Sequence, residues 1–358
     1  LKLWLSARRR SHIRGDSHIS KTPAMASLLE RRGRKVIAVD RDVVRSEQST
    51  GVNGNGATIL RLGPGEKIFD RYYWEEVLQE EGDGGKVVVC RSKCAPEEDG
   101  FQYVMKIRSK ESLRKRGFET TFRKIQLRML SLPAHCGVIP THEVLEDDRF
   151  MYVVMEKASE SDFIKGLLRE FSSGVIPIAE MKRLTREMLD AVGHIHNQGI
   201  LHRDIKPDNF VLEVRDEPSS PTGKAVSPKL IDFDHADPEF DSKSAVRRTS
   251  FQAGTLCFNA PETFLGVYSE QSDLYSVGAC VYLLMAGKMP YDEAIFEIAG
   301  PKEQYYAMRR AQVDWECDPW PQQQACKTFC ESLLECDLKK RVASVEEALK
   351  SAWFTDRS

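Results

Sequence analysis

One short polar stretch constrains this chain more than any other. His202-Arg203-Asp204-Ile205-Lys206-Pro207-Asp208-Asn209 precedes a short apolar run, Phe210 to Leu212, and supplies a carboxylate, a cation and an amide within one tight loop. Asp232 follows 28 residues after Asp204, at the end of another apolar run. Phosphoryl transfer requires a carboxylate to orient a hydroxyl group, a cation beside the migrating phosphoryl group and hard oxygen ligands for Mg²⁺. These two segments contain all three.

Further motifs extend this pattern in both directions, and together they resemble the eukaryotic protein kinase domain of the serine/threonine type. Tyr103-Val104-Met105-Lys106 is similar to the third-strand lysine motif, and Ala260-Pro261-Glu262 to the end of the activation segment. Asp337 to Arg341 resembles the late Asp-x-x-x-Arg stretch, in which Arg341 would pair with Glu262. One such motif is a weak signal, but several in the family's order, between residues 70 and 354, are a strong one.

The resemblance implies an α+β, two-lobed protein kinase fold, with a small antiparallel β-sheet lobe that holds one helix and a larger, mainly helical lobe. Short β-type runs do dominate as far as residue 157, and helical spacing follows beyond residue 160. We therefore expect the small lobe at residues 67–157 and the large lobe at 158–354. The polar, Pro/Ser-rich residues 213–228 predict a surface loop inserted in the large lobe.

Residues 1–66 predict a basic, disordered tail followed by a flexible linker. Positions 1–48 hold 12 Lys and Arg against 5 Asp and Glu, and positions 49–66 are rich in glycine. Basic runs of this kind can contact nucleic acid or acidic lipid. The alternative, which we favour, is a solvated tail without such a partner.

Composition narrows the functional class further. The formal net charge of -2 argues against a dedicated nucleic-acid binder. The longest apolar run, Val277 to Gly287, is shorter than the roughly 20 residues of a bilayer span, so we expect no membrane span. Nine cysteines without a framework spacing predict free thiols in a reducing compartment, the cytoplasm or, alternatively, the nucleus. We expect a monomer.

The resemblance also assigns roles to individual residues. Asp204, Lys206 and Asn209 would form the catalytic loop, in which Asp204 orients the acceptor hydroxyl and Lys206 stabilises the phosphoryl group in transit. Asn209 and Asp232 would bind Mg²⁺, and Lys106 would contact the α- and β-phosphates of ATP. The other expected ATP contacts come from the glycine loop, the adenine pocket and the backbone of the hinge: Gly82, Gly84, Gly85, Val87, Val104, Val211, Glu156 and Ala158.

The glycine loop is irregular, because Glu80 stands where the family has its first glycine. Taken alone, Asp83-Gly84 is typical of an ordinary hairpin turn. Its position before Lys106 favours a lid over the nucleotide phosphates.

Two other departures concern the groups around Lys106. The family's third helix offers a glutamate, but Gln126 stands twenty residues after Lys106, and Glu119 fits that place poorly. Asp234 stands where the family has the glycine of Asp-Phe-Gly. With Glu80, these departures support an alternative, a catalytically impaired pseudokinase that acts as an ATP-binding scaffold. We favour the active kinase, because every group that would touch phosphate or metal is present.

The activation segment, Asp232 to Glu262, contains Arg247-Arg248-Thr249-Ser250. A phosphate there could pair with Arg203, and the alternative is an unmodified loop. Thr255 would bridge Asp204 and Lys206, which suggests serine/threonine specificity, and Asp273 would brace the catalytic loop. Protein substrates carrying Ser or Thr are therefore the expected partners.

Asp162 and Asp208 could receive a basic residue upstream of the phosphoacceptor, or they could be ordinary surface carboxylates. Residues 335–354 resemble those of the calcium/calmodulin-dependent and calcium-dependent protein kinases. The sequence contains no EF-hand loop pattern, so calcium binding is not expected.

Overall fold

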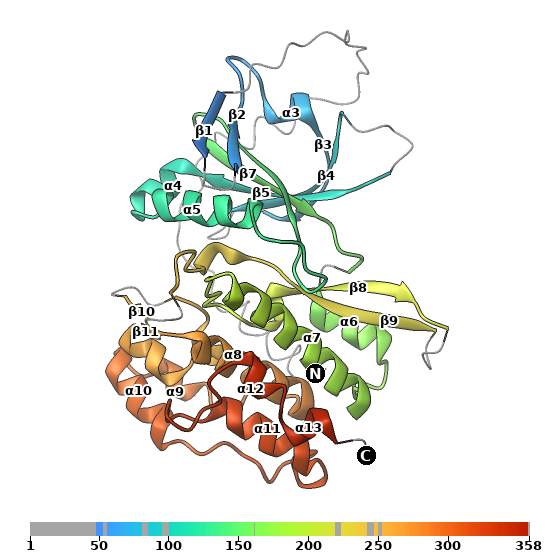
Figure 1. Ribbon diagram of the computed structural model, residues 1–358, viewed down its shortest axis with the longest axis vertical. Coiled ribbons are helices and arrows are strands. Elements are labelled where there is room, and N and C mark those ends of the chain that lie inside the picture. The colour runs from blue at the N-terminus through green and yellow to red at the C-terminus, as the bar shows by residue number, and fades with distance from the viewer. Residues whose placement is uncertain are drawn as a thin grey trace.

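A computed structural model of the chain describes residues 48–52, 56–80, 85–94, 100–160, 162–218, 223–241, 247–249 and 253–356. Figure 1 shows a β-rich small lobe above a larger helical lobe. The structure therefore confirms the α+β, two-lobed architecture that the sequence predicts. Across the described ranges, no helix combines the length and the apolar character that a membrane span requires. All nine cysteines are free thiols, as expected.

The small lobe is built on one sheet of seven strands in the order β1-β2-β6-β7-β5-β4-β3, in which only β2 and β6 pair in parallel. The strands are β1 (Gln48–Val52), β2 (Thr58–Arg61), β3 (Tyr72–Gln79), β4 (Lys86–Ser92), β5 (Tyr103–Ser109), β6 (Thr141–Glu146) and β7 (Phe150–Glu156). The helices are α3 (Ile68–Arg71), α4 (Lys110–Lys115) and α5 (Glu119–Leu130). Strand β5 carries Lys106 and pairs on both edges, with β4 and β7, so the position of this lysine is well fixed.

Strand register decides which side chains face the large lobe. Val87 of β4 lies opposite Lys106, and Val153 of β7 lies opposite it on the other side. Directly opposed residues share a face of the sheet, as do residues two apart on one strand, so Val104 stands on the same face. The other face carries an apolar cluster that includes Tyr72, Val88, Met105, Leu145, Tyr152 and Val154.

Helix α5 contacts both lobes. Phe122 packs under the sheet with Val144, whereas Ile125 and Met129 belong to the apolar core of the large lobe. These residues are three or four positions apart, which is the spacing of one broad helix face. Gln126 lies on this buried stretch and is 4% exposed, so its amide stands at the boundary between the lobes.

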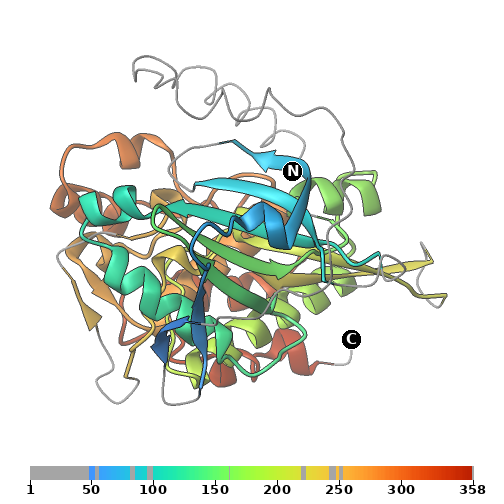
Figure 2. The ribbon, with the colours of Figure 1, turned by 90° about the horizontal axis from the view of Figure 1, so that it is seen from above.

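The expected linker at 49–66 is wrong for its described residues, because these include strands β1 and β2. Leu60 of β2 lies opposite Leu145 of β6, and Ile59 is fully buried against helices α4 and α5. Figure 2 shows these strands beside α5, at the edge of the sheet. The run Thr58–Leu62 carries three apolar residues, and the glycines on both sides hide this strand signal in the sequence. Residues 1–47 of the expected tail lie outside the described residues.

The large lobe packs eight α-helices around one core within the described ranges. They are α6 (Phe163–Glu170), α7 (Ile178–Asn197), α8 (Glu270–Ala286), α9 (Ala294–Glu297), α10 (Pro301–Arg310), α11 (Gln324–Leu334), α12 (Val345–Ala348) and α13 (Ala352–Thr355). Helix α8 forms the centre, because every residue from Ser272 to Leu284 is buried. A helix that is apolar on all sides can be accommodated only in this way. Gly287 ends α8 in the left-handed conformation typical of such caps.

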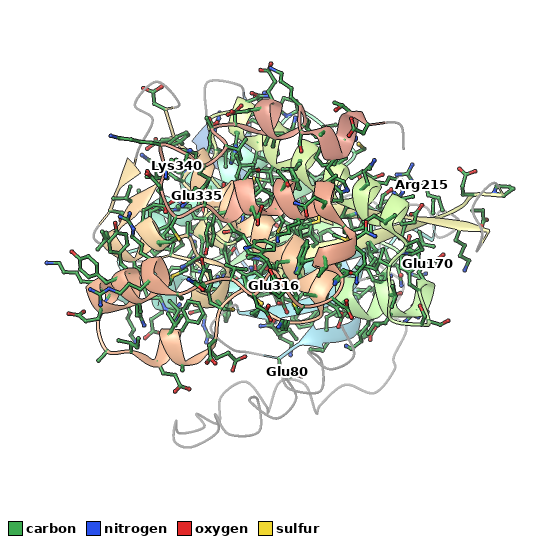
Figure 3. The ribbon with its side chains drawn as sticks, turned by 90° about the horizontal axis from the view of Figure 1, so that it is seen from below. Glu80, Glu170, Arg215, Glu316, Glu335 and Lys340 are labelled. Atoms are coloured by element: carbon green, nitrogen blue, oxygen red, sulfur yellow. The ribbon has the colours of Figure 1, made fainter. Side chains whose placement is uncertain are left out.

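The expected surface loop at 213–228 is also wrong in part. Strands β8 (Phe210–Asp216) and β9 (Lys224–Leu230) form an antiparallel hairpin, with Glu213 opposite Ser227. Val226 is 2% exposed, and the alternation of polar and apolar residues around it fits a strand with one buried face. Arg215 of β8 lies at the rim of the molecule in Figure 3. Residues 219–222, between the two strands, lie outside the described ranges.

Candidate active site

The catalytic loop is anchored to the core of the large lobe by Asp273, as expected from the sequence. This buried carboxylate accepts hydrogen bonds from the backbone N–H groups of His202 and Arg203, both at 2.9 Å, and pairs with His196 at 2.9 Å. Burial opposes its ionisation, but these hydrogen bonds lower the pKa of Asp273 below its ordinary value. Arg203 has a left-handed backbone (φ 64°), which costs about 1–3 kcal/mol, and the charged hydrogen bonds offset that strain.

His202 connects the catalytic loop to the strand that leads to Asp232. Burial lowers the pKa of His202, so the ring is neutral at pH 7. One neutral tautomer satisfies both ring nitrogens, because Nε2 donates to the carbonyl of Ile231 (3.1 Å) and Nδ1 accepts from the N–H of Asp204 (3.3 Å). The backbone of Asp204 is therefore fixed relative to that of Asp232.

Asp204, Lys206 and Thr255 form a closed triangle. The Thr255 hydroxyl donates to Asp204 Oδ1 (2.8 Å) and accepts from Lys206 Nζ (2.7 Å), and Lys206 Nζ lies 3.0 Å from Asp204 Oδ2. Asn209 Nδ2 also donates to Oδ2 (3.0 Å). The bridge expected at Thr255 is thus present, and the Asp204 carboxyl group is oriented beside the side-chain nitrogen of Lys206.

Gly254 lets this triangle form. Its backbone is left-handed (φ 91°), and a Cβ atom there would lie 2.5 Å from the carbonyl oxygen of Arg203 and 2.4 Å from Asn259 Oδ1. Only glycine tolerates both conditions, so a side chain here would push Thr255 away from the catalytic loop.

Asp232 stands across the cleft from Lys106, and its Oδ1 lies 2.7 Å from Lys106 Nζ. Burial would raise the pKa of Asp232, but the charges of Lys106 and Arg108 lower it to about 2. The amide nitrogen of Asn209 donates hydrogen bonds to Asp204, so the amide oxygen of Asn209 is turned away from that residue. This oxygen and the carboxylate of Asp232 are hard ligands that suit Mg²⁺. Within the described residues, no group of three or more His, Cys, Asp or Glu side chains forms a metal site. Magnesium typically uses one or two protein oxygens and completes its shell with phosphates and water, so the residues present fit this ion.

A second group of predicted residues forms an apolar patch beside the cleft. Val211 and Ala158 are buried together with Ile139, and Met155 and Ile231 pack against them. Glu156 ends β7 and donates its N–H to the carbonyl of Pro140 (3.2 Å). Sequence reasoning missed Ile139 and Ile231 as pocket residues, because neither belongs to a motif that marks a nucleotide pocket.

The glycine loop is described only at its end. Gly85 has φ 76°, and a Cβ atom there would lie 2.2 Å from the carbonyl oxygen of Ile107, so only glycine fits. Val87 and Val104 are half-buried on the cleft face of the sheet. Gly82 and Gly84, both predicted nucleotide contacts, lie outside the described residues.

Gln126, Lys106 and Asp234 line the same small cavity. Glu119, the alternative candidate, instead pairs with Arg114 at 2.6 Å. Asp234 points toward β5 and lies 2.8 Å from Lys106 Nζ.

The activation segment is partly described. Strand β10 (Arg247–Arg248) pairs with β11 (Val267–Tyr268), and the Thr249 N–H donates to Gly266 (2.9 Å), whereas Ser250 lies outside the described residues. The Arg203 guanidinium donates to the carbonyl groups of His235 (2.6 Å) and Ala236 (3.1 Å). The segment ends at the buried, bidentate ion pair expected between Glu262 and Arg341, with contacts of 2.6 and 2.9 Å.

Of the two carboxylates that could receive a basic substrate residue, Asp162 caps helix α6. It accepts from the Lys165 N–H at 3.0 Å. Asp208 is exposed at the catalytic loop.

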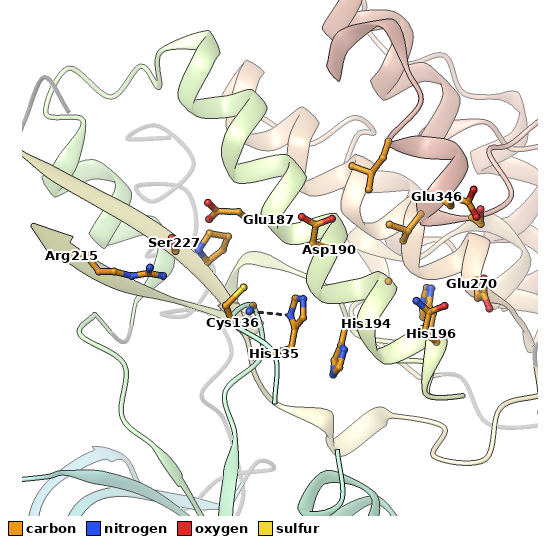
Figure 4. Close-up of a pocket in the computed structure, with 17 residues that line it drawn as sticks. His135, Cys136, Glu187, Asp190, His194, His196, Arg215, Ser227, Glu270 and Glu346 are labelled. Atoms are coloured by element: carbon orange, nitrogen blue, oxygen red, sulfur yellow. Dashed lines mark hydrogen bonds between the residues drawn. The ribbon is translucent and has the colours of Figure 1, made fainter. Parts of the chain in front are cut away.

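A larger cavity lies elsewhere in the large lobe, between α7, α12 and residues 135–137 (Figure 4). Its wall includes the stacked rings of His135 and His194 and the carboxylates of Asp190 and Glu346. None of the predicted site residues lines it, so the chemistry described above belongs to the cleft between the lobes.

A family model described as the protein kinase domain matches residues 76–354, well over half of the chain. The chain belongs to the protein kinase family. This kinase domain is 28% identical to CDPK-related kinase 4 of Arabidopsis thaliana over 349 residues. The matched region covers 94% of this chain and 54% of that protein. It is 27% identical to calcium/calmodulin-dependent serine/threonine-protein kinase 1 of Oryza sativa subsp. japonica over 321 residues. That match covers 86% of this chain and 48% of the rice protein.

Calcium/calmodulin-dependent protein kinase type II of Caenorhabditis elegans is 27% identical over 295 residues, covering 81% of this chain and 37% of that protein. The resemblance to the calcium-dependent and calcium/calmodulin-dependent group is thus confirmed. The chain spans about half the length of the curated relatives it matches.

Proposed function

We propose that this protein is a serine/threonine protein kinase that transfers the γ-phosphate of ATP to protein hydroxyl groups. The observation that most strongly supports this proposal is the triangle of Asp204, Lys206 and Thr255, whose side chains are 2.7 to 3.0 Å apart. It places the Asp204 carboxyl group and the Lys206 side chain side by side, and the cleft above them carries Lys106 and Asp232. The threonine at position 255 and the relatives named serine/threonine kinases support hydroxyl acceptors of that class.

In the proposed reaction, the acceptor oxygen bonds to the γ-phosphorus while the bond from that phosphorus to the ADP oxygen breaks. Asp204 orients the hydroxyl group and takes its proton, and Lys206 offsets negative charge on the moving phosphoryl group. Mg²⁺, held by Asn209 and Asp232, would supply positive charge at the phosphates. Closed hydrogen bonds around Asp204 keep the carboxylate in place before the substrate arrives, which lowers the entropic part of the barrier.

ATP would bind with its adenine against the apolar patch around Val211 and Ala158 and its phosphates toward Lys106. Val87 and Val104 stand on the sheet face above this space, and Gly85 immediately precedes β4, the strand that closes over it. The backbone of Glu156 and Ala158 would provide the polar contacts at the hinge. Nine free thiols support a reducing compartment, the cytoplasm or the nucleus.

The second candidate is a pseudokinase that binds ATP as a scaffold. The observation that favours it is the uncharged Gln126 in the place of the family's glutamate, together with Asp234 in the place of its glycine. An active enzyme remains our proposal, because none of the groups around Asp204 is altered.

The test is transfer of labelled γ-phosphate from Mg-ATP to a mixed library of Ser, Thr and Tyr peptides. We expect the wild-type chain to label Ser and Thr peptides, and Asp204→Asn to lower the rate by about 10² to 10⁴-fold, since it removes the proton acceptor. Asp190→Asn makes the same chemical change at an exposed position of α7 and should keep the wild-type rate. Full activity of Asp204→Asn would overturn the assignment. ATP binding without any transfer by the wild type would favour the scaffold.

A further inference from the structure

Lys106 belongs to a compact group of four charges at the boundary between the lobes. Lys106 and Arg108 are two residues apart on β5 and therefore extend from the same face of the sheet. Asp232 and Asp234 face them from the segment that follows β9. One oxygen of Asp234 lies 2.8 Å from Lys106 Nζ and also accepts from the Arg108 guanidinium. The side chains of Lys106, Arg108 and Asp234 are only 10–11% exposed.

These four groups balance one another, with two positive and two negative charges. Removal of one member would leave a buried charge without its counter-charge, which is among the more costly changes in a protein interior. The backbone of Asp232 is left-handed (φ 63°), and its carboxylate accepts from the Asp234 N–H at 3.4 Å. This turn brings both carboxylates to the same side, toward β5.

Gln126 completes the arrangement by being neutral. It lines the same cavity as Lys106 and Asp234 and is 4% exposed. A glutamate at this position would add a further carboxylate to the cavity that Asp234 lines, where the two like charges would repel each other. The neutral glutamine on α5 therefore adds no charge to the cavity, and Asp234 supplies a negative charge close to Lys106.

Arg108 explains why Asp234 keeps a fixed orientation. Its guanidinium lies over the ring of Phe122, at 5.8 Å from the ring centroid, and Phe122 precedes Gln126 by about one turn of α5. Arg108 thus contacts both the helix and Asp234. An aspartate held by two cations has little freedom to turn away from Lys106.

We propose that Asp234 is a positioning residue that supplies a second carboxylate partner of Lys106, beside Asp232, in place of a glutamate on α5. The proposal deepens the proposed kinase function and rests on it, because Lys106 matters here as the contact to the ATP phosphates. It also means that the lysine is held by the segment that carries Asp232. A shift of α5 alone would leave this ion pair intact.

The test is a double-mutant cycle on residues 126 and 234, with Asp234→Asn, Gln126→Glu and the double variant. We expect Asp234→Asn to lower kcat/KM for ATP by about tenfold or more, because Lys106 keeps only Asp232, which is also needed for Mg²⁺, and loses the second carboxylate that holds its position. Gln126→Glu alone should also lower it, through repulsion with Asp234. The double variant should have a higher kcat/KM for ATP than either single variant, because the new glutamate replaces the lost negative charge. A purely structural role of Asp234 would not produce this rescue by a glutamate on a different element, α5.

Glu111→Gln is the matched control, since it removes a carboxylate that is 74% exposed on α4 of the small lobe, and it should behave as wild type. Wild-type kinetics in Asp234→Asn, or a double variant no better than its parents, would overturn the proposal. If Asp234→Asn does not fold, as judged by thermal melting, the pair Asp234→Gly with Gln126→Glu recreates the family's usual arrangement. That double variant must then fold and bind Mg-ATP within a few-fold of wild type, and failure to do so counts against the proposal.

A second readout separates this proposal from the proposed function. Dissociation constants for Mg-ATP are measured for the same variants by displacement of a fluorescent ATP analogue. If the wild type binds ATP but transfers no phosphate, the kinase assignment fails. The same double-mutant cycle, calculated from the Mg-ATP dissociation constants, still decides the role of Asp234. A wild-type chain that binds no ATP would overturn both.

Discussion

Replacement of Ile59 by alanine tests whether strand β2 is part of the catalytic fold. Ile59 is fully buried in a cluster with Phe122 of α5, Val144 of β6 and Met151 of β7. The substitution removes three buried carbon atoms, and at about 0.8 kcal/mol each the lost transfer free energy is about 2.4 kcal/mol. The cavity left behind raises the expected loss to about 3–4 kcal/mol. This is a large fraction of the 5–15 kcal/mol by which domains are typically stable.

Urea unfolding monitored by tryptophan fluorescence measures this loss, and amide exchange in β6 and α5 localises it. Ile298→Ala is the matched control, because the same three carbon atoms are removed from a residue that is 38% exposed, and it should change the free energy of unfolding by less than about 0.5 kcal/mol. Equal unfolding midpoints for the two variants would refute the packing assigned to Ile59. Faster exchange confined to the large lobe would refute it as well.

Two buried carboxylates of the large lobe give further expectations. Glu262→Gln leaves the Arg341 guanidinium buried without its counter-charge, so urea unfolding should show a loss of about 3–5 kcal/mol, and a loss below about 1 kcal/mol would contradict this. Asp273→Asn should cost about 2–4 kcal/mol at pH 7, because three hydrogen bonds to an ionised group are weakened. The folded-state pKa of Asp273 is lowered, so its carboxylate stabilises the fold above its ordinary pKa, and this stabilisation is lost as the pH falls through the folded value. The deficit of the variant should therefore shrink below about pH 4, and an equal deficit at pH 7 and about pH 3.5 would argue against this ionic role.

The parts of the site that the sequence predicts well are those whose chemistry is local. Asp204, Lys206 and Asn209 lie within six residues, and their spacing alone places them on one loop. Thr255 and Asp273 are distant in sequence, and their contacts could be named only through the resemblance to a family. The structure adds the distances that make those contacts hydrogen bonds.

The features that sequence reasoning missed depend on contacts between remote segments. Asp234 is visible in the sequence as a departure, but its ion pairs with Lys106 and Arg108 join residues more than a hundred positions apart. Strand β2 is short and flanked by glycines, and it becomes a strand because β6 offers it an edge and α5 a surface to cover. Propensity is a weak guide where tertiary packing decides.

The two lobes are joined by contacts of opposite chemical character. Ile125 and Met129 of α5 are embedded in the core of the large lobe, whereas Lys106 and Arg108 of β5 meet Asp232 and Asp234 in ion pairs. Separation of apolar surfaces in water is unfavourable throughout, but separated charges regain hydration that offsets much of the lost attraction. Opening of the cleft should therefore separate the ion pairs first, while the apolar contact between α5 and the large lobe stays closed as the nucleotide enters.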